Sequence, residues 1–304
     1  MRYSVALPND RVDQPDDFLT AAAVADIASS VEDAGFDACF VTDHPFGSDR
    51  WLAAGGHHAL DPLVELSFAA AATTRLGLHT NIYVLPYRNP FLAAKSVLSL
   101  DVLAGGRVIL GVGAGYVGSE FDALGVDFDE RNDLLEEGIE AMKLAWTQDC
   151  VVLQGRHFRA RGNTMLPRPS SRPHPPVWMG GNSKRAITRA ARSCQGWSPL
   201  PTTANRAPRT ASVSNLEELR QRIALLHKEV EAIGRTEPLD ICLSLLQPSP
   251  GSADYEPQHT RAYIRALEDV GVTWVGVRPV AGRSRKSYLD QARRFADDVM
   301  AALR

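Results

Sequence analysis

The stretch Leu76–Gly111, LGLHTNIYVLPYRNPFLAAKSVLSLDVLAGGRVILG, holds two short apolar runs with a helical pattern between them. Leu76–Ile82 and Arg107–Gly111 have the length and composition of buried strands. Pro90–Leu103 has the length and apolar spacing of a helix, and the pair Gly105-Gly106 suits its end. A strand, a helix and a second strand in this order predict a parallel sheet, because parallel strands need a crossover connection.

The same alternation runs through all 304 residues and predicts eight strand–helix units in one domain, residues 1–304. The expected strands are Tyr3–Leu7, Asp37–Thr42, Leu76–Ile82, Arg107–Gly111, Pro176–Met179, Gly196–Ser198, Leu239–Leu245 and Thr273–Val277. The expected helices are Phe18–Ala34, Asp61–Thr73, Pro90–Leu103, Arg131–Trp146, Ser183–Arg192, Leu216–Ile233, His259–Val270 and Ser287–Leu303. Eight such units predict an α/β fold of the (β/α)8 TIM-barrel type, with a doubly wound open sheet as the alternative.

Two segments are expected as insertions in this pattern. Val151–Arg159, with Gly155 in its turn, predicts a hairpin after the fourth helix. Pro199–Ser214 is rich in Pro, Thr, Ser and Arg and predicts a long loop after the sixth strand. A loop of this length is usually functional or disordered, and this one would lie over the mouth of the barrel.

Composition narrows the class of function. Apolar residues make up 44% of the chain, charged residues 23%, and the formal net charge is −3, so nothing indicates a nucleic-acid partner. The cysteines form no CxxC pair, so no metal site and a reducing compartment are expected. No signal peptide and no apolar run of roughly 20 residues is present, so the protein is expected to be cytoplasmic and to have no membrane partner.

Active sites of (β/α)8 barrels lie at the C-terminal ends of the strands. Four segments that follow or end predicted strands are therefore the candidates: Thr42–Pro45, Thr80–Ile82, Gly111–Tyr116 and Gly180–Ser183.

The segment Gly180–Ser183 has the features of an anion site. Its two glycines let backbone amides approach an oxyanion, and the helix that follows favours negative charge at its N-terminus. Asn182 or Ser183 can serve as the N-cap of that helix. The segment is therefore a candidate phosphate site, and a plain turn between strand and helix is the alternative.

The sequence GVGAGY, Gly111–Tyr116, resembles a dinucleotide fingerprint only loosely, because the expected acidic residue after a second strand is missing. Its three glycines favour instead a surface with few side chains, against which a flat ring can pack. A structural turn is the alternative.

Asp43-His44 places a carboxylate and an imidazole at a strand end. Histidine exchanges protons near neutral pH, so His44 is the candidate acid or base. Adjacent residues on a strand point to opposite sides, so both need not face the same pocket. The other histidines considered are interpreted as surface residues: His57, His58, His79, His157 and His174.

Taken together, these segments resemble the bacterial luciferase-like monooxygenase superfamily, and within it the oxidoreductases that depend on coenzyme F420, a deazaflavin. The resemblance runs from about Tyr3 to Phe295 and is carried by VTDHP (Val41–Pro45), TNIYVLPYRNPFLAAK (Thr80–Lys95), LDVLAGGRVILGVGAGY (Leu100–Tyr116), ERNDLLEEGIEAMKLAW (Glu130–Trp146) and PVWMGGNS (Pro176–Ser183).

The resemblance implies a role for each candidate position. Asp43 and His44 would be the catalytic pair near the deazaflavin ring. Thr80, Asn81 and Ile82 would support the ring from behind, with a cis peptide bond expected between Asn81 and Ile82. The remaining expected cofactor contacts are Gly111, Gly113, Ala114, Gly115 and Tyr116 along the ring and its ribityl chain, and Gly180, Gly181, Asn182 and Ser183 at the phosphate.

Two departures from the family pattern bear on substrate and cofactor. The sugar-phosphate dehydrogenases of the family carry a Trp shortly after the Asp-His pair and a Glu in the strand-four loop, where this chain has Phe46–Ser48 and Ala114. A sugar-phosphate substrate is therefore not expected. The luciferases have an Arg near the position of Ala114 for the FMN phosphate, and its absence favours coenzyme F420 over FMN.

The resemblance thus implies hydride transfer between coenzyme F420 and a small organic substrate, with His44 as proton donor or acceptor. The alternatives are an FMNH2-dependent monooxygenase of the same fold and a barrel that binds a cofactor without turnover. The family usually forms dimers, so a homodimer is expected.

Overall fold

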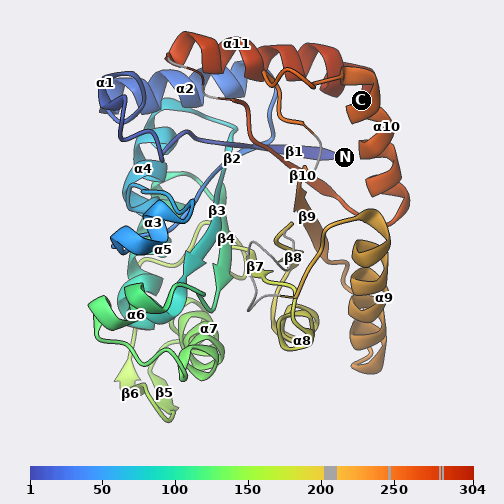
Figure 1. Ribbon diagram of the computed structural model, residues 1–304. Helices are drawn as coiled ribbons and strands as arrows, with labels where there is room; N and C mark the ends of the chain where they lie inside the picture. Colours follow the sequence, from blue (N-terminus) through green and yellow to red (C-terminus); the bar gives the residue numbers. More distant parts are fainter. Residues whose placement is uncertain (202–210, 246–247, 281, 283) are drawn as a thin grey trace.

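Eight parallel strands form a closed barrel, and helices surround it on the outside (Figure 1). The structure, a computed structural model, describes residues 1–201, 211–245, 248–280, 282 and 284–304. Around the barrel the strand order is β1-β10-β9-β8-β7-β4-β3-β2, and β1 pairs with both β10 and β2, so the sheet closes on itself. The fold is the predicted (β/α)8 barrel, and the open-sheet alternative is excluded.

The barrel strands are β1 (Arg2–Ala6), β2 (Ala38–Val41), β3 (Gly77–Val84), β4 (Val108–Gly113), β7 (Val177–Gly180), β8 (Gly196–Ser198), β9 (Asp240–Ser244) and β10 (Trp274–Val277). The helices are α1 (Pro15–Phe18), α2 (Ala21–Asp33), α3 (Asp49–Ala53), α4 (Pro62–Ala72), α5 (Pro90–Leu103), α6 (Gly118–Leu124), α7 (Arg131–Thr147), α8 (Lys184–Ser193), α9 (Leu216–Ala232), α10 (Pro257–Asp269), α11 (Arg285–Phe295) and α12 (Ala301–Leu303), with a 3-10 turn η1 (Leu85–Tyr87) and a π-helical turn η2 (Ala296–Met300).

The predicted elements agree with these bounds to within a few residues, and most differences lie at the ends. The expected first helix, Phe18–Ala34, is α2, which begins at Ala21 because Thr20 caps it by accepting from the Ala23 amide. The short helix α1 precedes it and ends at Phe18. Four short elements were not predicted: α1, α3, α6 and η1. The longest of them has seven residues, which is too short to produce a helical period in the sequence.

A hairpin is present after α7, as predicted, with strands β5 (Val151–Gln154) and β6 (Arg159–Asn163). It extends beyond the expected Val151–Arg159, because the second strand only begins at Arg159. Its turn begins at Gly155, whose amide donates to the Phe158 carbonyl. The long loop expected over residues 199–214 lies partly outside the described residues, which stop at 201 and resume at 211.

Side chains alternate between the barrel interior and the helices. Val275 and Val277 of β10 belong to the main core, whereas Trp274 belongs to a separate cluster with Ala38, Ile109, Trp178 and Cys242 from other strands. That cluster fills the lower barrel interior, because its members come from five different strands. Two residues further along each strand, the side chains again point inward.

The inward positions nearest the C-terminal ends of several strands carry small residues: Gly113, Gly180, Ser198, Ser244 and Gly276. Neighbouring side chains take up part of the space in this layer, since a Cβ at Gly113 or Gly180 would meet Ile82 and one at Gly276 would meet Ser244. The C-terminal mouth above this layer is where active sites of the fold lie.

Candidate active site at the mouth of the barrel

Asp43 and His44 follow β2 and point in different directions, as alternation on a strand requires. The Asp43 carboxylate accepts hydrogen bonds from Arg88 Nη1 at 2.6 Å, Arg88 Nη2 at 3.0 Å and the Val84 amide at 2.8 Å. Its side chain is 1% exposed. Asp43 thus joins β2 to the end of β3 and is not free to exchange protons with a ligand.

His44 forms a buried polar cluster with Glu120 of α6 and Tyr87 of η1. His44 Nδ1 lies 3.3 Å from Glu120 Oε2, which also accepts from the Tyr87 hydroxyl at 2.8 Å. Burial raises the pKa of Glu120, but the hydrogen bonds from His44 and Tyr87 outweigh it and hold that pKa below its ordinary value. Because an ionised carboxylate only accepts, Nδ1 carries the proton and Nε2 is left for the mouth.

Trp51 of α3 covers the imidazole of His44. The two ring centroids are 4.5 Å apart, and the ring of His57 lies 4.7 Å from that of His44. A Cβ at Gly47 or at Gly56 would lie within 2.6 Å of the Trp51 ring, so these two glycines make the space in which the indole sits. As a result, only 9% of the His44 side chain is exposed.

The peptide bond between Asn81 and Ile82 is cis, as the resemblance implies. The register of β3 against β4 shifts at the same place, between Thr80 and Tyr83, so the strand bulges. Asn81 and Ile82 are both partly exposed at this bulge, and Asn81 Oδ1 accepts from the Ser198 hydroxyl at 3.0 Å.

The glycines at the ends of β4 and β7 make room for Ile82. A Cβ at Gly113 would lie 2.0 Å from Ile82 Cδ1, and one at Gly180 would lie 2.8 Å from the same atom. A Cβ at Gly111 would lie 2.1 Å from the Thr80 carbonyl oxygen. The expectation that these glycines leave a bare surface for a ring is therefore corrected: the bulge itself occupies their space and becomes the surface.

The other residues expected along the ring lie in different surroundings. Thr80 is fully buried and donates its hydroxyl to the Gly111 carbonyl at 2.8 Å, so its side chain belongs to the barrel wall. Gly115 has a φ of +79°, which favours glycine, and it turns the chain after β4. Ala114 is partly exposed, and the ring of Tyr116, 48% exposed, lies 6.0 Å from that of His44.

The turn from Gly180 to Ser183 leads into α8. Gly181 has a φ of +108°, and the Ser183 hydroxyl caps the helix by accepting from the Ala186 amide. Asn182 is 1% exposed, and its side chain is bound to the backbone of Leu200 and Ala211. The Asn182 amide group therefore holds the two described ends of the loop after β8 and does not face the turn.

Backbone donors remain free at this turn. Within the described residues, the backbone amides of Asn182, Ser183, Lys184 and Arg185 donate no hydrogen bond. Together with the helix N-terminus, they form a set of donors suited to an anion.

Three of the histidines interpreted as surface residues are not on the surface. His57 packs on His44, and His174 is 8% exposed. His79 is fully buried inside the barrel, where burial lowers its pKa to about 3. Its inward position on β3 explains the burial, and its ring lies 4.9 Å from that of Trp178.

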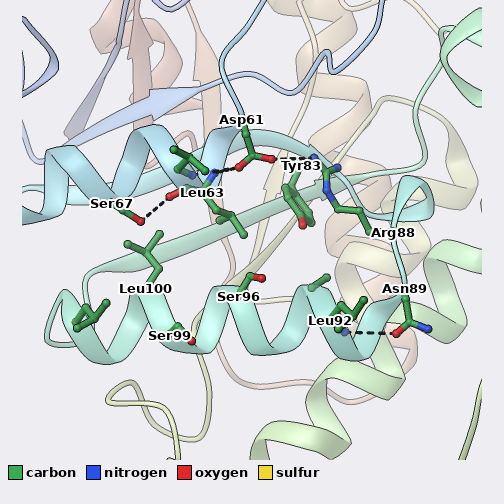
Figure 2. A pocket seen from close by; sticks show the side chains of 13 residues that line it. Asp61, Leu63, Ser67, Tyr83, Arg88, Asn89, Leu92, Ser96, Ser99 and Leu100 are labelled. Atoms are coloured by element: carbon green, nitrogen blue, oxygen red, sulfur yellow. Dashed lines mark hydrogen bonds and ion pairs between the residues drawn. The ribbon is translucent and has the colours of Figure 1, made fainter. Parts of the chain in front are cut away.

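A groove of about 510 Å³ lies away from the mouth, between α4 and α5 (Figure 2). Arg88 lines one end of this groove. Its guanidinium stacks on Tyr83 at 4.1 Å and lies 3.5 Å from Asp61.

In the described part of the chain, no group of three or more His, Cys, Asp and Glu side chains could hold a metal ion. No described helix is long and apolar enough to span a membrane.

Sequence reasoning missed four residues of this site: Glu120, Tyr87, Trp51 and His57. Glu120 stands 76 positions from His44, and nothing in the linear spacing links the two. One sequence feature bears on Trp51: the Trp that some family members carry shortly after the Asp-His pair is missing here. The indole is supplied from α3 instead, because Ser48 caps that short helix and directs Trp51 back over His44.

Comparison with known proteins shows the family of this chain. The family described as luciferase-like monooxygenase matches residues 1–302. An FMNH(2)-dependent dimethylsulfone monooxygenase of Pseudomonas putida is 34% identical over 170 residues, which cover 55% of this chain and 45% of that protein. An uncharacterised protein of Mycobacterium tuberculosis is 29% identical over 81% of both chains.

Solved structures share the fold. A monooxygenase from Streptomyces bottropensis, RslO1, superposes with a TM-score of 0.84 over the whole of both chains, at 21% identity. A coenzyme F420-dependent tetrahydromethanopterin reductase from Methanopyrus kandleri covers 100% of this chain and 99% of its own, with a TM-score of 0.75 and 16% identity. Because the family match covers nearly the whole sequence, this chain belongs to the luciferase-like monooxygenase family.

Proposed function

We propose that this protein is a coenzyme F420-dependent oxidoreductase that transfers a hydride between the deazaflavin and a small organic substrate at the mouth of the barrel. The observation that carries the proposal is the arrangement of His44, the Ile82 bulge and the free amides before α8 around one mouth. The family's flavin and deazaflavin chemistry needs these three elements together: a proton carrier, a support for the ring and an anion site.

The described residues fit such a cofactor. Ile82 stands between Gly113 and Gly180 and offers a partly exposed apolar surface for one face of a ring. The free amides from Asn182 to Arg185 and the N-terminus of α8 suit a phosphate. When bound, the deazaflavin supplies the hydride donor or acceptor.

His44 then acts on the proton that accompanies the hydride. Glu120 accepts from Nδ1 and fixes the imidazole, so Nε2 is the atom directed to the substrate. The Tyr87 hydroxyl fixes the Glu120 carboxylate in turn, at 2.8 Å. Trp51 and His57 exclude water from the imidazole. Asp43 contributes by holding β2 and β3 together through Arg88.

An FMNH2-dependent monooxygenase is the second candidate. It is favoured by the Pseudomonas putida relative, whose name states dependence on FMNH2. The two candidates differ in their need for oxygen, since a monooxygenase consumes O2 and a hydride transfer from a deazaflavin does not.

Anaerobic turnover tests the choice between them. Purified protein is mixed with reduced F420 and a panel of electron-poor carbonyl and alkene acceptors in the absence of O2, and reoxidation of the deazaflavin is followed by absorbance. We expect reoxidation with at least one acceptor, slowed about 100-fold or more in His44→Ala. Turnover that occurs only with FMNH2 and O2 would contradict the proposal.

We also propose a homodimer, as the resemblance implies. Four apolar side chains on α4 and α5 are well exposed, namely Val64, Phe68, Leu92 and Leu103. Sedimentation velocity at micromolar concentration is expected to give a species of twice the chain mass of 33.1 kDa. A monomer that persists across the concentration range would contradict it.

A further inference from the structure

Arg278 follows directly after β10, at the C-terminal mouth of the barrel. On β10, Val275 and Val277 face the helices and Trp274 faces the interior, so alternation directs Arg278 toward the barrel axis. Its guanidinium carbon lies 4.9 Å from the ring centroid of Phe40, an inward residue of β2. Because β1 lies between β10 and β2, the side chain passes over the end of β1 toward β2.

The guanidinium is accessible and has no partner of opposite charge in contact. Arg278 is exposed to solvent, yet surrounding protein lowers the pKa of its guanidinium, which is what a recessed position produces. Among the described residues it donates no hydrogen bond and forms no ion pair within 4.0 Å. Asp10, an exposed residue after β1, acts on it only at longer range. Since an arginine stays protonated, this positive charge is free to meet an anion.

The side chains beneath Arg278 are small. The inward position below it on β10 is Gly276, and the Ser244 hydroxyl of β9 takes up the space there, since a Cβ at Gly276 would lie 2.8 Å from Ser244 Oγ. Ile82 fills the opposite sector of the mouth, between β4 and β7. The mouth thus has two halves, one with the apolar bulge and one with the cation.

His44 and His57 border the cationic half. His57 packs on His44 at 4.7 Å between ring centroids. Burial lowers the pKa of His57, the hydrogen bond with the His58 carbonyl and the Asp10 carboxylate oppose that effect, and His44 and Arg278 act in the same direction as burial.

We propose that Arg278 binds the carboxylate of the substrate, so that the protein acts on a small organic acid rather than on a neutral molecule. A guanidinium presents two parallel N–H donors that match the two oxygens of a carboxylate. This assignment rests on the proposed function for its chemistry, but the binding of an anion can be measured separately.

Isothermal titration calorimetry of the full chain without cofactor tests the assignment. The probes are acetate, benzoate, phenylacetate and decanoate, each compared with its neutral amide. We expect at least one acid to bind tenfold or more tightly than its amide. In Arg278→Met that preference is expected to disappear, and Arg278→Lys should retain part of it, because lysine keeps the charge but loses the planar fork.

The matched control is Arg220→Met, which removes an exposed arginine from α9 and should leave the preference unchanged. A wild-type protein that binds no acid more tightly than its amide would overturn the assignment, and so would an unchanged preference in Arg278→Met. Parallel titration of each variant with F420 separates the two proposals. Lost acid preference with intact F420 binding supports Arg278 as a substrate group, and loss of F420 binding in Arg278→Met would assign it to the cofactor instead.

Discussion

Replacing Gly113 with alanine tests how the mouth of the barrel is built. The new Cβ would lie 2.0 Å from Ile82 Cδ1, whereas ordinary van der Waals contact begins at 3.4 Å. On the other side of Ile82 lies the main chain of Gly180, at which an added Cβ would lie 2.8 Å from Ile82 Cδ1. Overpacking costs about 1–3 kcal/mol, and because Ile82 is partly exposed and its terminal atom can move, we expect the free energy of unfolding to fall by about 1 kcal/mol.

The partner substitution Ile82→Val removes the Cδ1 atom responsible for the clash. The nearest remaining atom, Cγ1, lies 3.3 Å from the new Cβ, which a small shift can accommodate. Ile82→Val alone should cost about 0.5–1.5 kcal/mol. The double variant should then be more stable than the sum of the single effects by about 0.5–1 kcal/mol.

Equilibrium urea denaturation followed by tryptophan fluorescence measures these differences as shifts of the midpoint at constant m value. Gly118→Ala is the matched control, because a Cβ there meets nothing within 4 Å and the position begins α6. Its effect should stay within about 0.5 kcal/mol. The reasoning is refuted if Gly113→Ala is as stable as the control, or if the effects of Gly113→Ala and Ile82→Val simply add.

Three further predictions concern the polar cluster and its cover. Hydrogen bonds hold the pKa of Glu120 below its ordinary 4.5 despite burial, so its ionised form stabilises the fold above about pH 4.5 and this contribution disappears as the pH falls through the lowered value. The stability difference between wild type and Glu120→Gln, measured in urea, should therefore shrink between pH 7 and pH 3. Arg88→Met leaves the Asp43 carboxylate, 1% exposed, without its charged partner, and should lower the free energy of unfolding by about 3–5 kcal/mol. Trp51→Ala removes the cover of His44, whose side chain is 9% exposed, and should speed its modification by diethylpyrocarbonate, read by mass spectrometry.

Each of these three predictions has a control measurement or a control variant. A difference between wild type and Glu120→Gln that does not change with pH would contradict the pKa assignment. For Arg88→Met the reference is Arg220→Met, which breaks an exposed pair with Glu217 and should cost less than about 1 kcal/mol. For Trp51→Ala it is the exposed His58, whose rate should not change. Equal effects in test and reference would count against the corresponding contact.

The barrel was predictable from the sequence because each strand and helix carries its own apolar pattern. The sequence also indicated where to look for a site, since active sites of barrels lie at the C-terminal strand ends. The direction of the side chains was partly predictable: alternation already suggested that Asp43 and His44 need not face the same pocket, and they do not.

The partners of those residues were not predictable. Glu120 meets His44 only because α6 returns to the mouth, and contacts between distant positions leave no periodic signal. Trp51 lies on a helix of five residues, too short for a pattern. The role of Gly113 depends on the register of β3 against β4 and on a bulge, neither of which a single sequence specifies.

Titration of the protein with F420 and separately with FMN, followed by fluorescence quenching, tests the central claim most directly. Two variants sharpen it. Lys184→Pro removes the backbone amide at the first position of α8, where proline suits the helix and the extended Ser183 before it, and Lys184→Ala removes only the side chain. We predict that F420 binds at least tenfold more tightly than FMN, and that Lys184→Pro binds F420 about tenfold more weakly than Lys184→Ala, because a hydrogen bond to a charged group contributes about 1.5–3 kcal/mol. Tight binding of FMN without binding of F420, or equal F420 affinity in the two variants, would contradict the account.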